Sequence, residues 1–139
     1  VGQSMSETLE SGDEILVNRF IYKVSDPKPN DIIVFLPNGN EKSHYYVKRV
    51  IGLPGETVEI VDGKVYINGS DTPLEESYLP EPMEGSYGPY TVPEGSYFML
   101  GDNRNYSNDA RRWTHKYVKR DKLVAKVLFQ YFPKIQKLN

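Results

Sequence analysis

The chain has 139 residues, of which 38% are hydrophobic and 26% charged, a composition typical of a soluble globular protein with one modest core. Its net charge of −2 gives no indication of a nucleic-acid partner, and the absence of cysteine excludes disulfides and thiolate metal sites. No apolar run approaches the roughly 20 residues that a transmembrane helix needs.

Strand patterns dominate the chain. Seven short runs are rich in β-branched and aromatic residues, namely 14–20, 31–35, 45–51, 57–61, 64–68, 96–100 and 123–129. The fourth and fifth runs flank Asp62 and Gly63, a dipeptide typical of a tight hairpin turn. Short strands at this spacing predict an all-β barrel or sandwich-like core.

The sequence also contains a proline-rich stretch and few helix signals. Residues 70–95 contain five prolines, which predicts a loop or lid-like extension rather than a core element. Helix signals are weak, and only single turns are expected, at residues 6–9 and 120–122. The predicted fold is therefore mostly β, with very little helix.

Ser4 and Lys48 are the candidates for nucleophilic chemistry. A serine hydroxyl is a weak nucleophile until a base removes its proton. Histidine usually does so, but His44 and His115 have no local signature of a triad, and two histidines without cysteine make a zinc site improbable. A lysine can replace histidine where burial disfavours its charged form, and Lys48 lies in an apolar strand pattern. Taken alone, each residue also fits a structural role, as a helix N-cap or a solvated strand lysine.

Four blocks decide between these readings because together they resemble type I signal peptidases, membrane-bound Ser/Lys proteases that remove secretory signal peptides. The blocks follow the family's order and comprise Ser4–Leu9, Ser11–Arg19, Tyr46–Gly55 and Gly101–Asp109. They resemble the nucleophile box, the strand box after it, the general-base box and the last conserved box. The resemblance implies a β-barrel or β-sheet catalytic core of the signal-peptidase type.

The resemblance also implies a role for each site residue. Ser4 would be the nucleophile, and Lys48 the base that takes the serine proton and later gives it to the leaving amine. Ser107 would orient the Lys48 amine. Supporting ion pairs would join Asp109 to Arg111 and Asp102 to Arg49. The backbone N–H of Ser4 would donate to the oxyanion, whereas Gly2 stands where some members supply a second, hydroxyl donor.

The expected substrate is a preprotein with small residues before the cleavage point. The peptide would bind extended along a strand edge, with pockets lined by Met5, Leu9, Val34 and Phe35. No cofactor is expected. Trp113 and Tyr117 are candidates for contact with a lipid surface, and for Trp113 a place in the core is an equal alternative.

The expected catalytic core comprises residues 1–60 and 97–139, with a small β-ribbon insertion at residues 61–96 whose size is similar to that of the Gram-positive type. Because the chain starts without Met almost at Ser4, we expect a single transmembrane helix upstream. The domain would then lie on the extracytoplasmic face of the cell membrane.

Four positions depart from the family pattern. Glu7 stands at a usual proline, Ala110 at a common hydroxyl residue, and Lys119 and Ala125 at a usual proline and glycine. They suggest a divergent branch with a restricted client such as a surface pilin.

Two alternatives remain. A non-proteolytic assembly chaperone for pilins or other surface proteins would share the fold, although the presence of both Ser4 and Lys48 argues against it. A self-cleaving repressor-type protease would share the dyad, but the chain contains no helix-turn-helix pattern or basic patch.

Overall fold

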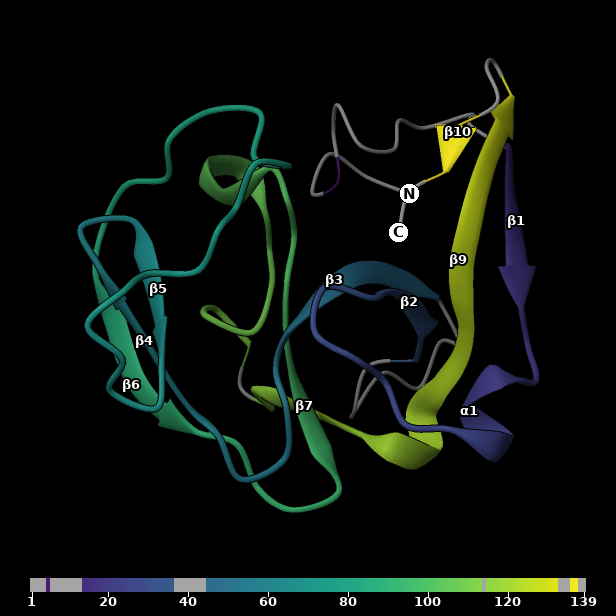
Figure 1. Cartoon of the computed structure of the whole chain (residues 1–139), viewed down its shortest axis with the longest axis horizontal. Coiled ribbons are helices and arrows are strands. Elements are labelled where there is room, and N and C mark those ends of the chain that lie inside the picture. Colours follow the sequence, from purple (N-terminus) through teal and green to yellow (C-terminus); the bar gives the residue numbers. More distant parts are fainter. Residues whose placement is uncertain (1–4, 6–13, 37–44, 114, 133–135, 138–139) are drawn as a thin grey trace.

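The computed structural model describes residue 5 and residues 14–36, 45–113, 115–132 and 136–137 (Figure 1). These residues form two antiparallel sheets with only short helical turns, so the predicted mostly-β class is confirmed. None of the helices in these ranges is long and apolar enough to cross a membrane.

The elements follow one another closely along the chain. The strands are β1 (Glu14–Asn18), β2 (Ile32–Phe35), β3 (Tyr46–Gly52), β4 (Thr57–Val61), β5 (Lys64–Ile67), β6 (Tyr87–Thr91), β7 (Ser96–Leu100), β8 (Tyr117–Lys119), β9 (Leu123–Phe132) and β10 (Gln136–Lys137). The helical turns are α1 (Ile21–Val24), η1 (Arg104–Tyr106) and η2 (Arg120–Lys122). The single turn expected at 120–122 is thus present, and the one expected at 6–9 lies outside the described residues.

The large sheet has the strand order β1-β9-β2-β3-β7-β8, with β10 added to β9. Its central strands are buried on both faces, so β2 and β7 are almost continuously apolar, whereas β3 also buries Lys48 and Arg49. Along β7, Tyr97 and Met99 pack into one buried cluster, whereas Phe98 and Leu100 pack into another. Any polar side chain on β3 is therefore enclosed by the fold.

The small sheet has the order β5-β4-β6 and lies on the left in Figure 1. Asp62 and Gly63 have φ angles of 48° and 79°, which confirms the predicted tight hairpin between β4 and β5. Val58 and Ile60 of β4 share one buried cluster with Phe98 and Leu100 of β7, so the two sheets have a common core. The division into a core and an insertion at 61–96 stays a prediction, and the small sheet itself begins at Thr57.

One strand lies where the sequence predicts a loop. β6 falls within residues 70–95, so the loop expectation is wrong for Tyr87–Thr91. Pro89 lacks a backbone N–H and argues against a strand, but β6 is an edge strand that pairs with β4, and edge positions tolerate the missing donor. The four-residue α1, the three-residue β8 and the two-residue β10 were also not predicted, because such short segments carry no periodic signal.

Gly52 is the last residue of β3, and the chain continues from it to β4 of the small sheet. A Cβ atom at this position would lie 2.7 Å from Val58 Cγ2, and 3.0 Å from both Phe98 Cβ and Val92 Cγ2. These atoms belong to buried side chains of the common core, so they have little room to move. The close approach of the two sheets therefore requires glycine here.

Gly52→Ala should destabilise the fold by about 1–3 kcal/mol, because the added methyl group overpacks the junction between the sheets. The urea midpoint should fall, while Glu59→Ala, at an exposed position on β4, should leave the midpoint nearly unchanged. Equal midpoints for Gly52→Ala and the parent chain would show that the junction relaxes freely.

Candidate active site

Lys48 is buried in the middle of the large sheet. Only 5% of the residue is exposed, and its strand β3 lies between β2 and β7. The backbone of Lys48 pairs with Ile33 of β2, and its Nζ atom lies 5.7 Å from the centroid of the Tyr46 ring. Side chains alternate along a strand, so Tyr46, Lys48 and Val50 share one face of β3.

This burial changes the acidity of the Lys48 amine. Loss of solvation lowers the pKa of Lys48 from 10.5 to about 8. The Asp109 carboxylate opposes this shift, and the Arg111 guanidinium adds to it. A substantial fraction of the amine is therefore neutral near pH 8, which is the form that can accept a proton.

Ser107 presents a second polar group in the interior. The residue is 3% exposed, and its Oγ makes no hydrogen bond with any described residue. A buried hydroxyl without a partner costs about 1–3 kcal/mol. Such a cost indicates a position where the hydroxyl has a task other than stabilising the fold.

Asp109 and Arg111 form a buried ion pair behind Lys48. Arg111 Nε lies 2.8 Å from Asp109 Oδ1, and its Nη2 lies 2.9 Å from Asp109 Oδ2. Arg111 Nη2 also donates to the carbonyl of Arg104 at 2.6 Å, and Asp109 accepts from the backbone N–H of Gly101 at 3.2 Å. These bonds hold the loop that carries Ser107.

Arg49 and Asp102 form a second buried pair with two parallel hydrogen bonds. Arg49 Nε lies 2.8 Å from Asp102 Oδ1, and Arg49 Nη2 lies 2.6 Å from Asp102 Oδ2. The backbone N–H of Asp102 donates to Met5 Sδ at 3.3 Å. Both pairings expected from the sequence are thus present, while their supporting role in a reaction remains a proposal.

The residues expected to line substrate pockets lie in different environments. Met5 and Phe35 are 0% exposed, whereas Val34 is half-buried. β2 pairs with β3 on one side and with β9 on the other, so an added peptide strand has no free edge at Val34 and Phe35. Ser4 and Leu9 lie outside the described residues.

Trp113 and Tyr117 are both half-buried and packed against aromatic neighbours. The Trp113 ring centroid lies 6.1 Å from that of Phe35 and 5.9 Å from that of Tyr46. The Tyr117 ring lies 6.2 Å from that of Phe98. Much of each ring is therefore used by the folded chain itself.

The histidines do not form part of this arrangement as far as the structure describes them. His115 is exposed, and His44 lies outside the described residues. Across the described ranges, no group of three or more His, Asp or Glu side chains gathers as a metal ion would require.

A network around Arg104 was not predicted. Arg104 is 1% exposed; its Nη2 lies 2.7 Å from Glu76 Oε2, and its Nε donates to the carbonyl of Gly101 at 2.7 Å. The Tyr78 hydroxyl also donates to Glu76 Oε2 at 2.7 Å, and the Tyr78 ring centroid lies 3.9 Å from Arg49 Cζ. Burial, with Glu76 nearby, raises the pKa of Tyr78 well above its usual value, so the phenol stays a donor.

This network connects the proline-rich segment to the surroundings of Lys48. Tyr78 covers the guanidinium of Arg49, the residue that follows Lys48, and Glu76 fixes Arg104. The carbonyl of Arg104 in turn accepts a hydrogen bond from Arg111. Because Glu76 lies 28 residues from Arg104 in a stretch that predicts a loop, no local signal reveals the contact.

Comparisons with known proteins agree on one family. The family model described as "Signal peptidase, peptidase S26" matches residues 1–132. Signal peptidase I of Leptolyngbya laminosa is 41% identical over 137 residues, which cover 94% of this chain and 66% of that protein. Signal peptidase I P of Bacillus subtilis subsp. natto is 37% identical over 95% of this chain and 74% of that protein.

A crystal structure of a signal peptidase I from Enterococcus faecalis is similar to this fold. The TM-score is 0.60 at 37% sequence identity, and the match covers 73% of this chain and 97% of that one. The chain spans only 60% of the length of another relative, the probable signal peptidase I-2 of Synechocystis. The curated relatives are thus longer proteins that include the region described here.

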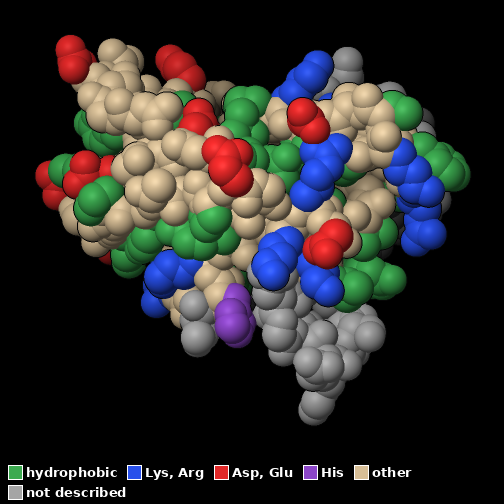
Figure 2. All heavy atoms as spheres, turned by 90° about the horizontal axis from the view of Figure 1, so that it is seen from below, with side chains coloured by type: hydrophobic (Ala, Val, Ile, Leu, Met, Phe, Trp, Pro, Cys, Tyr) green, Lys and Arg blue, Asp and Glu red, His purple; other side chains and the backbone are tan. Residues whose placement is uncertain are grey.

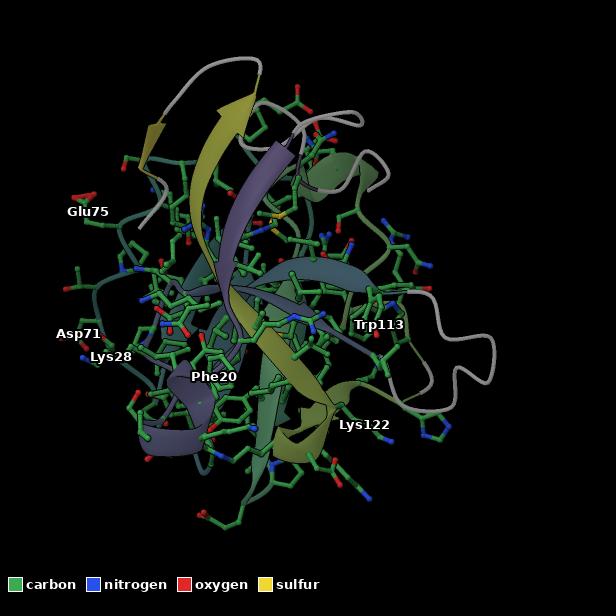
Figure 3. All side chains as sticks on the ribbon, turned by 90° about the vertical axis from the view of Figure 1, so that its right-hand side faces the viewer. Phe20, Lys28, Asp71, Glu75, Trp113 and Lys122 are labelled. Carbon is green, nitrogen blue, oxygen red and sulfur yellow. The ribbon has the colours of Figure 1, made fainter. Side chains whose placement is uncertain are left out.

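Glu76→Gln should lower the free energy of unfolding by on the order of 1–3 kcal/mol, because it leaves the buried Arg104 guanidinium without its carboxylate. Glu75→Gln is the matched control, since the neighbouring Glu75 is exposed and points away from the molecule (Figure 3). Chemical denaturation should separate the two variants. Similar small losses in both would mean that the pair between Glu76 and Arg104 is dispensable.

Proposed function

The chain belongs to the signal peptidase family, peptidase S26, and we propose that it carries the catalytic site of a serine endopeptidase that cleaves signal peptides from secreted preproteins. The main support for this proposal is the burial of Lys48 in a central strand, which lowers the pKa of its amine to about 8. An ammonium group is expensive to bury. A catalytic base must be neutral to accept a proton, and burial favours this neutral form.

In the proposed reaction, the neutral Lys48 amine takes the proton of the Ser4 hydroxyl while Ser4 Oγ attacks the scissile carbonyl carbon. The C–N bond then breaks, and the Lys48 ammonium returns the proton to the leaving amine. This step leaves an acyl-enzyme ester on Ser4. A water molecule, deprotonated by Lys48, then attacks the ester carbon. The bond from this carbon to Ser4 Oγ breaks, the Lys48 ammonium returns the proton to Ser4 Oγ, and the second product leaves as a carboxylic acid. The Ser4 backbone N–H is the proposed donor to the oxyanion.

Met5, the residue after the proposed nucleophile, is held in the described core. Met5 follows Ser4 in the chain, and Val47 precedes Lys48. Met5 and Val47 belong to one buried cluster, and Met5 Sδ accepts a hydrogen bond from Asp102. The residue next to Ser4 is thus anchored to β3, the strand that carries Lys48, and to the loop that begins at Asp102.

Ser107 is the proposed partner that orients the amine. Its buried Oγ, without a bond to other described residues, is suited to accept a hydrogen bond from Lys48 Nζ. The ion pairs of Asp109 with Arg111 and of Asp102 with Arg49 are proposed to fix the position of this loop relative to β3. These four residues would position the reacting groups without taking part in the reaction themselves.

The proposed substrate is an extended preprotein segment with small residues at the first and third positions before the cut. Of the four residues expected to line the pockets, Val34 is half-buried and is the candidate for a pocket wall, whereas Met5 and Phe35 are fully buried and would support such a wall from behind. Leu9, outside the described residues, completes the proposed set. Because β2 is paired on both sides, the peptide would have to pair with another edge and meet β2 only through side chains. Pilin precursors are one client class worth including in a substrate scan.

We place the active domain on the extracytoplasmic face of the cell membrane, tethered by one spanning helix. Signal peptides emerge at that surface, so tethering raises the effective concentration of enzyme and client. The related proteins named signal peptidase I support this activity over the alternative of a non-proteolytic assembly chaperone.

Ser4→Ala and Lys48→Ala should each lower kcat/KM for a signal-peptide substrate by about a thousandfold or more, and the double variant should be no worse than either. The two groups act as one unit, so their losses do not add. Lys64→Ala, at an exposed lysine of β5, is the control and should cleave normally. Near-normal cleavage by either single variant would sink the assignment.

The pH dependence should report the Lys48 amine. Because its pKa is lowered to about 8, kcat/KM should rise with pH up to that value and then level off. Below it, each pH unit should reduce kcat/KM by about tenfold. Ser107→Ala should shift or weaken this limb. If the limb instead disappears in His44→Ala or His115→Ala and is unchanged in Ser107→Ala, a histidine is the base.

A further inference from the structure

The short helix α1 presents two apolar side chains to solvent. Phe20 is 70% exposed and Val24 is 85% exposed, the largest fractions among the large hydrophobic residues that the structure describes as exposed. The two residues are four positions apart, so they lie on one side of the helical turn. Together they form a small exposed apolar patch.

Basic side chains accompany this apolar pair. Arg19 and Lys23 are both exposed, and Lys23 Nζ lies 5.3 Å from the centroid of the Phe20 ring. A cavity of about 530 Å3 opens beside them, and its lining includes Arg19, Lys23 and Arg120 as well as the acidic Asp121. The surface therefore combines two exposed apolar side chains, several basic side chains and a cavity large enough for a lipid headgroup.

The turn is held firmly in place. Arg120 pairs with Asp26, and its Nη2 donates to the carbonyls of Tyr22 at 2.7 Å and Ser25 at 2.9 Å. These bonds fix the end of α1 on η2, next to β9. Phe20 and Val24 are thus presented by a rigid element.

Charge is segregated across the whole chain. Residues 56–95 contain nine acidic residues and one basic residue, a net charge of −8, so the remaining chain carries +6 within the total of −2. In Figure 2, acidic side chains gather over the small sheet on the left and most Lys and Arg side chains lie on the right. An anionic surface would attract the α1 half and repel the small sheet.

We propose that the α1 face, defined as Arg19, Phe20, Lys23 and Val24, docks onto the surface of an anionic lipid bilayer. Phe20 and Val24 would enter the interfacial region, while Arg19 and Lys23 meet the headgroup phosphates. A single helical turn is too small for a standard protein–protein interface, which buries about 800 Å2 on each partner. The charge segregation would orient the domain with its small sheet away from the bilayer.

This proposal gives the proposed membrane location a defined contact, and it names a different surface from Trp113 and Tyr117. Those two rings are packed against Phe35, Tyr46 and Phe98, whereas Phe20 and Val24 are open. In Figure 3 the labelled side chains of Phe20 and Trp113 lie apart. Variants can therefore separate the two surfaces.

The test is co-sedimentation of the 139-residue chain with vesicles of phosphatidylcholine alone or mixed with phosphatidylglycerol. The parent chain should bind the mixed vesicles, and added salt should weaken binding. The double variant Phe20→Ser, Val24→Ser should bind at least about tenfold more weakly. Arg19→Gln and Lys23→Gln should each weaken binding roughly fivefold. The controls Tyr45→Ser and Val61→Ser remove hydrophobic side chains that are 57% and 41% exposed, and they should bind like the parent.

Three results would overturn the proposal: no binding of the parent chain to mixed vesicles, undiminished binding of the Phe20→Ser, Val24→Ser variant, or a loss in Trp113→Ala that the α1 variants do not show. Cleavage of a soluble signal peptide by the α1 variants should match that of the parent. This assay keeps the two ideas separate, because an inactive parent chain would refute the peptidase proposal and leave the vesicle result standing.

Discussion

The enclosure of Lys48 by its own sheet is the constraint on which the rest of the site depends. β3 is flanked by β2 and β7, and the residues around Lys48 on that strand are buried. An amine in this position loses most of its hydration, and this loss is the main cause of its lowered pKa. A lysine at the edge of the sheet would keep its water and its proton.

Three buried arginines lie on or near this strand, each paired with a carboxylate. Arg49 pairs with Asp102, Arg104 with Glu76 and Arg111 with Asp109. Buried pairs of this kind contribute little net stability compared with apolar packing, but they fit only one arrangement of their partners. Their effect here is to join β3, the loop around Ser107 and the proline-rich segment into a single rigid unit.

The small sheet packs against this rigid unit and does not form a separate domain. Its strand β4 shares a buried cluster with β7, and Gly52 permits the close approach. Glu76 and Tyr78, in the connection between β5 and β6, reach back to Arg104 and Arg49. A segment that the sequence marks as a loop thereby helps to position the strand that carries the candidate base.

Local patterns predicted the elements whose causes are local. The hairpin at Asp62 and Gly63 follows from two residues with positive φ between alternating strands. β6 was missed because Pro89 reads as a strand breaker, and only tertiary structure reveals that the strand lies at an edge. The pairing of Asp109 with Arg111 came from the resemblance to a family. The contact of Glu76 with Arg104 lacks any such signal, because it depends on how a distant loop folds back.

The proposed reaction requires that the buried Lys48 amine be neutral at moderately alkaline pH. The most direct measurement is an NMR titration of the Lys48 side-chain 13Cε and 15Nζ shifts, with Lys48→Met used to assign the signal. We expect a midpoint near 8, well below the 10.5 of an unperturbed lysine. A midpoint at the ordinary value would contradict this expectation, because the amine would then remain protonated and be unable to act as the base.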